Sequence, residues 1–258
     1  MPGRILRALI IHESRLRWPI PANLPDQVSN QQVLACERRG KYLLIRFTRG
    51  TLLIHLGMSG SLRRVPMDEP LRKHDHVELC FDDARFLLHD PRRFGAVLWH
   101  SAQAGPVEQH PLLIHLGPEP FSPLFTPSVL YTGLHVHRQA VKQVLLGGKV
   151  VVGVGNIYAS ESLFQAGIDP RTAANRLSHP RCERLYNAIL LTLTQALESG
   201  GSTLRDYVNA QGKPGAYFAL HAAVYEHAGE PCPRCATPIR RIVQGQRATY
   251  FCPHCQKR

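Results

Sequence analysis

Hydrophobic and polar positions in the first hundred residues follow the pattern of antiparallel strands joined by short polar turns. Two pairs of apolar runs rich in β-branched and aromatic residues are each interrupted by three turn residues, at 48–50 and 82–84. This arrangement predicts two β-hairpins, and one more strand follows the segment 90–95. The predicted strands cover residues 42–47, 51–55, 77–81, 85–89 and 96–99.

The pattern changes after a proline-rich stretch at residues 105–127, which we expect to link two units. Beyond it, apolar residues recur at helical spacing and predict helices over residues 130–146, 156–166 and 180–199. In the third helix one apolar stripe is expected to be core rather than a binding feature: Leu185, Ile189, Leu193 and Ala196. The chain is therefore expected to be a multidomain α+β protein with strands first and helices second.

Four cysteines near the C-terminus are the strongest chemical signal in the chain. Cys232 and Cys235 form one CxxC pair, and Cys252 and Cys255 form a second pair after sixteen intervening residues. This spacing is typical of a structural zinc site on a β-hairpin, because each pair can point two thiolates at one tetrahedral ion. Two disulfides or four unrelated thiols are the alternatives.

The charge of the chain indicates what such a hairpin binds. The 258 residues carry 31 Lys plus Arg against 19 Asp plus Glu, a net charge of +12, and residues 232–258 contain six cationic side chains and no carboxylate. A basic surface of this kind favours nucleic acid first and an anionic membrane second. Because no run of 18 apolar residues and no signal peptide is present, we expect a cytoplasmic protein.

Two turns carry residues suited to phosphate or base recognition. Gly153, Val154, Gly155 and Asn156 precede a predicted helix, so the turn can hold an anion, or Asn156 can simply cap the helix, and both can hold together. The loop at 90–95, Asp-Pro-Arg-Arg-Phe-Gly, places two guanidinium groups beside an aromatic ring. Such a loop can wedge into stacked bases, or it can be an ordinary surface loop with a buried Phe.

Two further residues have ordinary structural explanations when each is considered by itself. Met58 is expected to fill a gap in the core, and Lys41 is expected to be a solvated residue at the start of a strand.

Taken together, these and other segments closely resemble the bacterial formamidopyrimidine-DNA glycosylase family. The resemblance runs in order along essentially the whole chain. It rests on HLGMSGSL at 55–62, KHDHVEL at 73–79, DPRRFGA at 90–96, HLGPEPF at 115–121, VVGVGNIYASESLFQAGIDP at 151–170, GKPG at 212–215 and QRATYFC at 246–252.

This resemblance implies a β-sandwich domain over residues 1–120, a helix-two-turn-helix domain over 121–220 and a four-cysteine zinc-finger hairpin over 221–258 with one structural Zn²⁺. It also implies a base-excision-repair glycosylase with apurinic-site lyase activity. Such an enzyme removes oxidised purines, 8-oxoguanine and formamidopyrimidines, from duplex DNA. The protein is expected to be a bacterial, nucleoid-associated monomer with no membrane partner.

The same resemblance assigns roles to matched residues. Met58, Arg92 and Phe94 match the trio that fills the hole left by an extruded base, a hole that must be occupied because flipping costs stacking energy. Lys41 and Arg247 match residues that act at the phosphates and sugar of the lesion, Arg247 also as an acid for the last elimination. The remaining matches are to DNA-contacting positions: His74, His137, Asn156 and Lys213.

One departure concerns the N-terminus, where the family does its chemistry with an N-terminal proline and the glutamate that follows it. In this chain Gly3 follows Pro2, and the segment from Ile5 to Pro19 resembles a strand that comes later in relatives. We interpret Pro2 as a coincidence. Either the start codon is assigned too late, which the intact remaining motifs favour, or the chain is a non-catalytic protein that binds damaged DNA.

Overall fold

The structure, a computed structural model, describes residues 1–202 and 215–258. The chain divides into two compact units. Unit 1 comprises Met1–Ile114 with Gly201–Gly215, and unit 2 comprises His115–Gly200 with Ala216–Arg258. The three domains expected from the sequence stay a prediction, because this division groups the helices with the cysteine hairpin.

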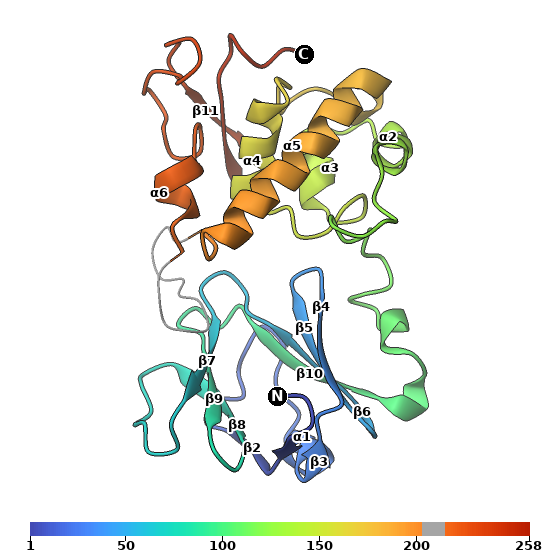
Figure 1. Cartoon of the computed structure of the whole chain (residues 1–258), viewed down its shortest axis with the longest axis vertical. Helices are drawn as coiled ribbons and strands as arrows, with labels where there is room; N and C mark the ends of the chain where they lie inside the picture. The colour runs from blue at the N-terminus through green and yellow to red at the C-terminus, as the bar shows by residue number, and fades with distance from the viewer. Residues whose placement is uncertain (203–214) are drawn as a thin grey trace. The chain divides into compact units, whose positions relative to one another are not determined.

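Unit 1 is a sandwich of two four-stranded antiparallel sheets, with strand orders β2-β8-β9-β7 and β10-β6-β5-β4 (Figure 1). A short β1-β3 pair and helix α1 (Leu24–Val28) complete it. The strands are β1 (Ile5–Leu6), β2 (Ala8–Ile11), β3 (Gln31–Gln32), β4 (Ala35–Arg39), β5 (Tyr42–Phe47), β6 (Gly50–His55), β7 (Ser61–Val65), β8 (Asp75–Cys80), β9 (Arg85–His89) and β10 (Ala96–Ser101).

Alternation of apolar side chains explains why these two sheets pack against each other. Both sheets contribute to one buried cluster, including Leu9, Val77 and Leu79 from the first sheet and Ile45, Leu52 and Val97 from the second. Gly50 at the start of β6 is required by close approach, because a Cβ there would lie 2.4 Å from the carbonyl oxygen of His100. The strands predicted from the sequence match β5, β6, β8, β9 and β10 within two residues at each end.

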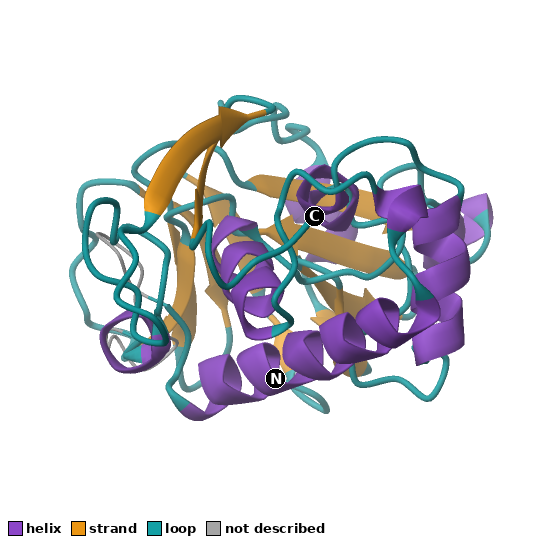
Figure 2. Cartoon of the chain, turned by 90° about the horizontal axis from the view of Figure 1, so that it is seen from above, coloured by secondary structure: helices purple, strands orange, loops and turns teal. Residues whose placement is uncertain are grey.

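Unit 2 contains helices α2 (Pro127–His135), α3 (Val141–Leu146), α4 (Asn156–Gln165), α5 (His179–Glu198) and α6 (Tyr217–His221), and the hairpin β11 (Arg240–Gln244) and β12 (Arg247–Phe251). Three short 3₁₀ turns lie in the two units at Ala102–Ala104, Val107–Gln109 and Ala174–Arg176. The long helix α5 packs along α4 and α2 (Figure 2). Its predicted apolar stripe is buried, as expected. Gly167 ends α4 with a positive φ of 69°, again as expected.

The predicted helix over residues 130–146 is wrong in its middle, because the structure breaks it into α2 and α3. Thr126 caps the beginning of α2 by accepting from the backbone N–H of Val129. Between the two helices the backbone bonds to a distant segment instead of continuing the helix. The backbone N–H of Asn175 donates to the carbonyl of His137, and that of Val141 donates to the carbonyl of Thr172.

Among the helices of the described residues, none combines the length and the apolar composition needed to cross a lipid bilayer.

Candidate zinc centre and nucleic-acid interface

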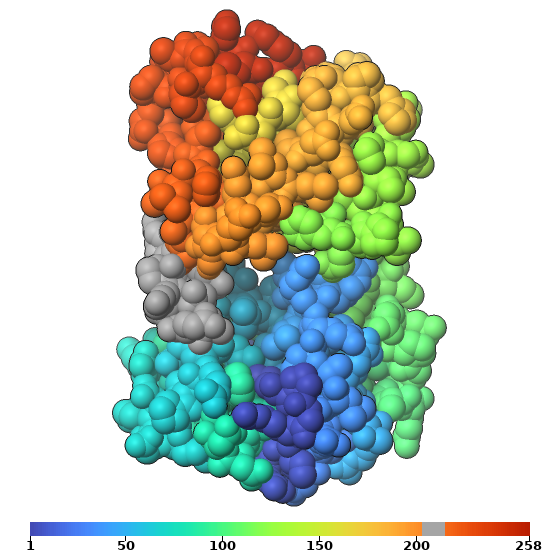
Figure 3. Space-filling view, viewed as in Figure 1, coloured from blue at the N-terminus to red at the C-terminus, as the bar shows by residue number. Residues whose placement is uncertain are grey.

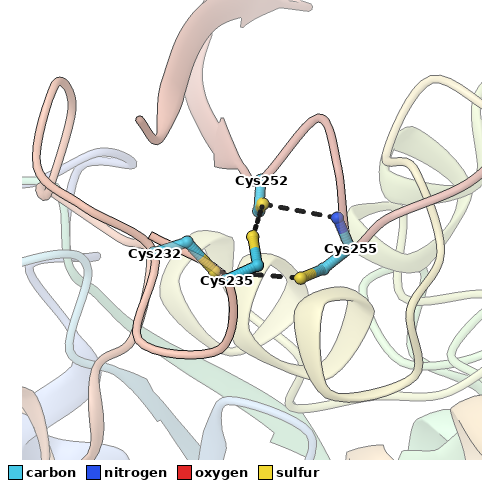
Figure 4. A group of neighbouring side chains, drawn as sticks. All are labelled: Cys232, Cys235, Cys252 and Cys255. Carbon is cyan, nitrogen blue, oxygen red and sulfur yellow. Dashed lines mark hydrogen bonds between the residues drawn. The ribbon is translucent and has the colours of Figure 1, made fainter. Parts of the chain in front are cut away.

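The four cysteines of the C-terminal hairpin converge on one point (Figure 4). All four Sγ atoms lie within 4.8 Å of one another, and the cysteines form no disulfide. The distance from Cys232 Sγ to Cys255 Sγ is 3.9 Å, and that from Cys235 Sγ to Cys252 Sγ is 3.5 Å. Four thiolates about 2.3 Å from a tetrahedral zinc ion stand roughly 3.8 Å apart, so these residues fit the ion. The disulfide alternative is wrong.

Backbone amides support two of the ligands. The N–H of Arg234 donates to Cys232 Sγ, and the N–H of Cys255 donates to Cys252 Sγ, each at 3.4 Å. Amide donors of this kind stabilise the thiolate form that binds metal. The centre therefore has the ligands and the second layer of hydrogen bonds of a closed structural zinc site.

Both cysteine turns rest on the C-terminal end of α4. The Arg234 guanidinium stacks on the Phe164 ring at 4.3 Å and donates to the Phe164 carbonyl at 3.1 Å. From the other turn, Gln256 Nε2 donates to the Ile168 carbonyl at 2.8 Å. A cation is favourable at this end of a helix, because the last carbonyls are unpaired and carry partial negative charge. Metal binding is thereby coupled to the position of α4.

The opposite end of α4 carries Asn156, and here the structure corrects the expectation that Asn156 is the helix cap. Gly155 is the N-cap, and Asn156 is the first helical residue. Its Nδ2 donates to the Ala248 carbonyl at 3.0 Å and to the Tyr225 hydroxyl at 3.2 Å. Arg247, the residue before Ala248, is exposed at the beginning of β12. Asn156 and Arg247 are thus brought together beside the free amides of the first turn of a helix, an arrangement that attracts anions.

A buried carboxylate holds this arrangement from behind. Glu161, in the middle of α4, is 1% exposed and accepts from the backbone N–H groups of Ala223, Val224 and Tyr225. Burial raises the pKa of Glu161, and the three amide donors act against that shift. The Tyr225 hydroxyl accepts from Asn156 Nδ2. By holding the backbone of Tyr225, Glu161 therefore also fixes the position of this partner of Asn156. Glu161 was not singled out from the sequence, since a Glu within a helix is ordinary.

In unit 1 the segment 90–95 forms a rigid loop with its aromatic residue outside. Asp90 is fully buried, and its Oδ2 accepts from the Gly95 N–H at 2.7 Å, which closes the loop. Phe94 is 45% exposed, so of the two alternatives left open by the sequence the buried ring is wrong. The Arg92 guanidinium lies over the Phe94 ring at 4.9 Å. Arg93, in contrast, is paired with Glu13 at 3.1 Å.

Met58 is placed on a neighbouring loop and is 68% exposed, so the expectation that it fills the core is also wrong. The two loops pack closely, because a Cβ on Gly57 would lie 2.7 Å from the Phe94 carbonyl carbon. Exposure of two large apolar side chains on adjoining loops is unfavourable in water and marks a binding surface. The structure therefore brings Met58, Arg92 and Phe94 together.

His74 adjoins this loop, since its carbonyl accepts from the Asp90 N–H at 3.0 Å. Its φ of 76° is unusual for a residue with a side chain. Desolvation, and after it the charges of Lys73 and His76, lower the pKa of His74. Half-buried in this cationic setting, His74 is favoured in the neutral form.

Lys41 is exposed in the turn between β4 and β5, and its charge contributes, after burial, to the lowered pKa of His55. Pro2 lies elsewhere. Its neighbour Gly3 donates to the Val33 carbonyl, before the beginning of β4, whereas Lys41 follows the end of that strand. The N-terminal residues lie on the surface of unit 1 (Figure 3).

Two further residues were predicted to contact DNA. His137 is half-buried in the segment between α2 and α3. Lys213 lies outside the described residues.

Comparison with known proteins agrees with this geometry. Three family models match the chain: the formamidopyrimidine-DNA glycosylase N-terminal domain over residues 1–97, the H2TH domain of the same glycosylase over 116–208, and the zinc finger found in FPG and IleRS over 229–258. The formamidopyrimidine-DNA glycosylase of Bordetella avium is 67% identical over 256 residues, 99% of this chain and 93% of that protein. That of Burkholderia lata is 54% identical over 257 residues, with the same shares.

Solved structures are similar as well. The crystal structure of the MutM (FPG) protein from Thermus thermophilus has 37% identity and a TM-score of 0.86, over 99% of this chain and 92% of that chain. Lactococcus lactis Fpg in complex with DNA that contains an abasic site has 30% identity and a TM-score of 0.88, over 100% of this chain and 94% of that chain.

Proposed function

The chain belongs to the formamidopyrimidine-DNA glycosylase family, and from this premise we propose that it excises oxidised purines from duplex DNA and cleaves the resulting abasic site. It is a base-excision DNA glycosylase with one structural zinc ion. Similar Lactococcus lactis structures are complexes with DNA containing Fapy-dG and with DNA containing an abasic site, which supports the proposal. We further propose a monomer that acts in the nucleoid, with no membrane partner.

The observation that carries the proposed site is the exposure of Met58 and Phe94 beside the Arg92 guanidinium. A flat ring and a flexible thioether can enter the stack, while a guanidinium can bond the edge of the base left behind. We assign to these three residues the filling of the space vacated by the lesion. The loop that carries two of them is pre-organised by Asp90, so little ordering is needed on binding.

Phosphate binding is assigned to Asn156 and Arg247 in unit 2, and to Lys41 and His74 in unit 1. The first pair lies at a helix N-terminus, where amides and a guanidinium favour negative charge. From the resemblance to the family we also assign to Arg247 the role of the acid in the last elimination step, in which its guanidinium, an exposed cation at the tip of the hairpin, transfers a proton to the leaving phosphate. His137 and Lys213 are proposed as additional DNA contacts.

Replacement of Arg247 by Ala tests the phosphate assignment. The variant should bind a duplex with one 8-oxoguanine about tenfold more weakly, and the slope of log K against log salt should fall by roughly 1, as expected for one lost phosphate contact. Fluorescence anisotropy at several salt concentrations measures both quantities. Excision of 8-oxoguanine in the same samples tests the activity itself.

Arg240→Ala is the matched control, since Arg240 is an exposed arginine at the other end of the same two strands. It removes the same charge but should change affinity much less. Equal losses in the two variants would show that only net charge matters and would remove Arg247 from the proposed site. Absence of excision of any oxidised purine by a form of the protein that begins with the proline and glutamate of its family would contradict the substrate assignment.

A further inference from the structure

Lys142 is the most completely buried cationic side chain of the described residues. It lies in α3 with 0% of its surface exposed, between the core residues Val141 and Val144. Its ammonium group donates to two neutral oxygens, the Ala248 carbonyl at 3.1 Å and Thr249 Oγ1 at 2.8 Å. Both acceptors belong to β12, more than a hundred residues further along the chain.

Such a position is costly for the fold. A cation buried without a carboxylate loses its hydration, and two neutral hydrogen bonds do not compensate for that loss. Burial, followed by repulsion from Arg247, lowers the pKa of Lys142 to about 7. A methionine of similar length would fill the same space without this penalty, so the lysine is not explained by packing.

The acceptor explains what the lysine does. The Ala248 carbonyl that receives Lys142 Nζ also receives Asn156 Nδ2 at 3.0 Å. One backbone group is therefore held by side chains from two helices, α3 and α4. Arg247 is its immediate neighbour, so these two bonds set the point from which the Arg247 side chain departs.

A second contact fixes the same hairpin tip. The residue after Lys142 is Gln143, and its amide lies against Gly245 so closely that a Cβ on Gly245 would stand 2.4 Å from its oxygen. Gly245 and Gln246 have positive φ values of 51° and 61°, which makes the tip a tight two-residue turn. The first turn of α3 thus holds the tip of the hairpin on one side of Arg247 and β12 on the other.

We propose that Lys142 is a positioning residue for DNA binding: it holds the beginning of β12 so that the Arg247 guanidinium and the backbone N–H of Asn156, the first residue of α4, contact the phosphates of one strand in fixed register. This inference rests on the proposed phosphate role of Arg247 and Asn156. Lys142 itself touches no substrate, because it is enclosed in unit 2.

The proposal is tested with a double-mutant cycle of Lys142→Met and Arg247→Ala. By itself Lys142→Met should weaken binding to an 8-oxoguanine duplex roughly tenfold, because Arg247 loses its fixed starting point. In the Arg247→Ala background the same change should weaken binding less than about threefold, since residues that act as a unit are not additive. Lys149→Met, which removes an exposed lysine soon after α3, should instead add its effect fully to that of Arg247→Ala.

Stability separates positioning from a merely structural role. Lys142→Met should keep one zinc ion per chain and melt at the same temperature as the wild type or higher, because a buried charge is removed. If it melts lower or loses zinc, Thr249→Val replaces it in the cycle, since this change removes one acceptor and conserves shape. The same non-additivity with Arg247→Ala is then expected.

The outcomes distinguish the two proposals. If Arg247→Ala leaves affinity unchanged, the phosphate site proposed above fails. Suppose instead that Arg247→Ala weakens binding. If Lys142→Met and Thr249→Val then leave the affinity unchanged, or if their losses of affinity add fully to that of Arg247→Ala, the positioning role of Lys142 is overturned and the proposed phosphate site is retained.

Discussion

Removal of zinc is expected to abolish binding to damaged DNA while leaving unit 1 folded. A two-stranded hairpin is marginal in water, and the small apolar cluster beneath β11 and β12 includes two of the ligands themselves, Cys232 and Cys252. Binding of zinc contributes an apparent 10–16 kcal/mol, roughly, in fingers of this kind. Without zinc, the contacts of Arg234 to α4 and of Ala248 to Asn156 are lost together. Arg247 is then no longer held beside Asn156, and the proposed phosphate site is not formed.

The fluorescence of the two tryptophans reports whether unit 1 stays folded when zinc is removed. Trp18 and Trp99 are both in unit 1, and no other tryptophan occurs in the chain. After treatment with a strong chelator, tryptophan emission should stay unchanged, about one zinc ion per chain should be released, and anisotropy should report no DNA binding. Re-addition of zinc should restore binding.

Substitution of the zinc ligands tests the same prediction without a chelator. Cys232→Ala combined with Cys235→Ala should behave as the chelated protein does. Cys36→Ala is the matched control, because Cys36 is an exposed cysteine outside the cluster and its loss should change neither zinc content nor affinity. Full affinity in the double variant would contradict the role given to the metal.

Phe94→Ala is expected to remove most of the preference for damaged over undamaged DNA without destabilising the protein. Flipping a base costs a few kcal/mol of stacking, and the ring that enters the stack offsets part of it. We expect affinity for an 8-oxoguanine duplex to fall roughly 10- to 100-fold, or about 1.4–2.7 kcal/mol. Affinity for undamaged duplex should change little, because phosphate contacts dominate non-specific binding.

Stability makes the same variant diagnostic. Phe94 is 45% exposed and stacks on the exposed Arg92, so its loss should leave the melting temperature within a degree or two of the wild type. Met67→Ala is the matched control, because Met67 is also a large apolar residue of unit 1 and is 49% exposed, but on a different loop. It should leave both affinities unchanged. If Phe94→Ala retains the wild-type preference for the lesion, the wedging role is wrong.

Local patterns predicted much of the fold because the rules behind them are local. The alternation in β5 and β6 and the turn between them depend on neighbours within a dozen residues, and so does the glycine that ends α4. The split of the predicted helix into α2 and α3 depends on a segment more than thirty residues away. Residues 172–175 take the backbone bonds that a continuous helix would have made.

Burial was the second point that periodicity could not decide. Considered singly, Met58 was expected in the core, and the burial of Phe94 was left open; both side chains are exposed, because loop residues follow no hydrophobic period. Conversely, Lys142 would be expected at the surface and is fully enclosed. Its only sequence signal is its place in a mostly apolar segment, Val141 to Leu146, in which Gln143 is also polar.

The sequence by itself determined the zinc ligands, the basic character of the finger, the strands and helices with regular periods, and through its motifs the glycosylase family. These depend on residue type and spacing along the chain. Tertiary structure alone decided that the Asn156 side chain bonds to Ala248 and Tyr225 instead of capping its helix, that Asp90 closes the loop at 90–95, and that Lys142 reaches β12 from α3. Each of these joins groups that are close only after folding, because buried polar atoms must find partners wherever packing brings them together.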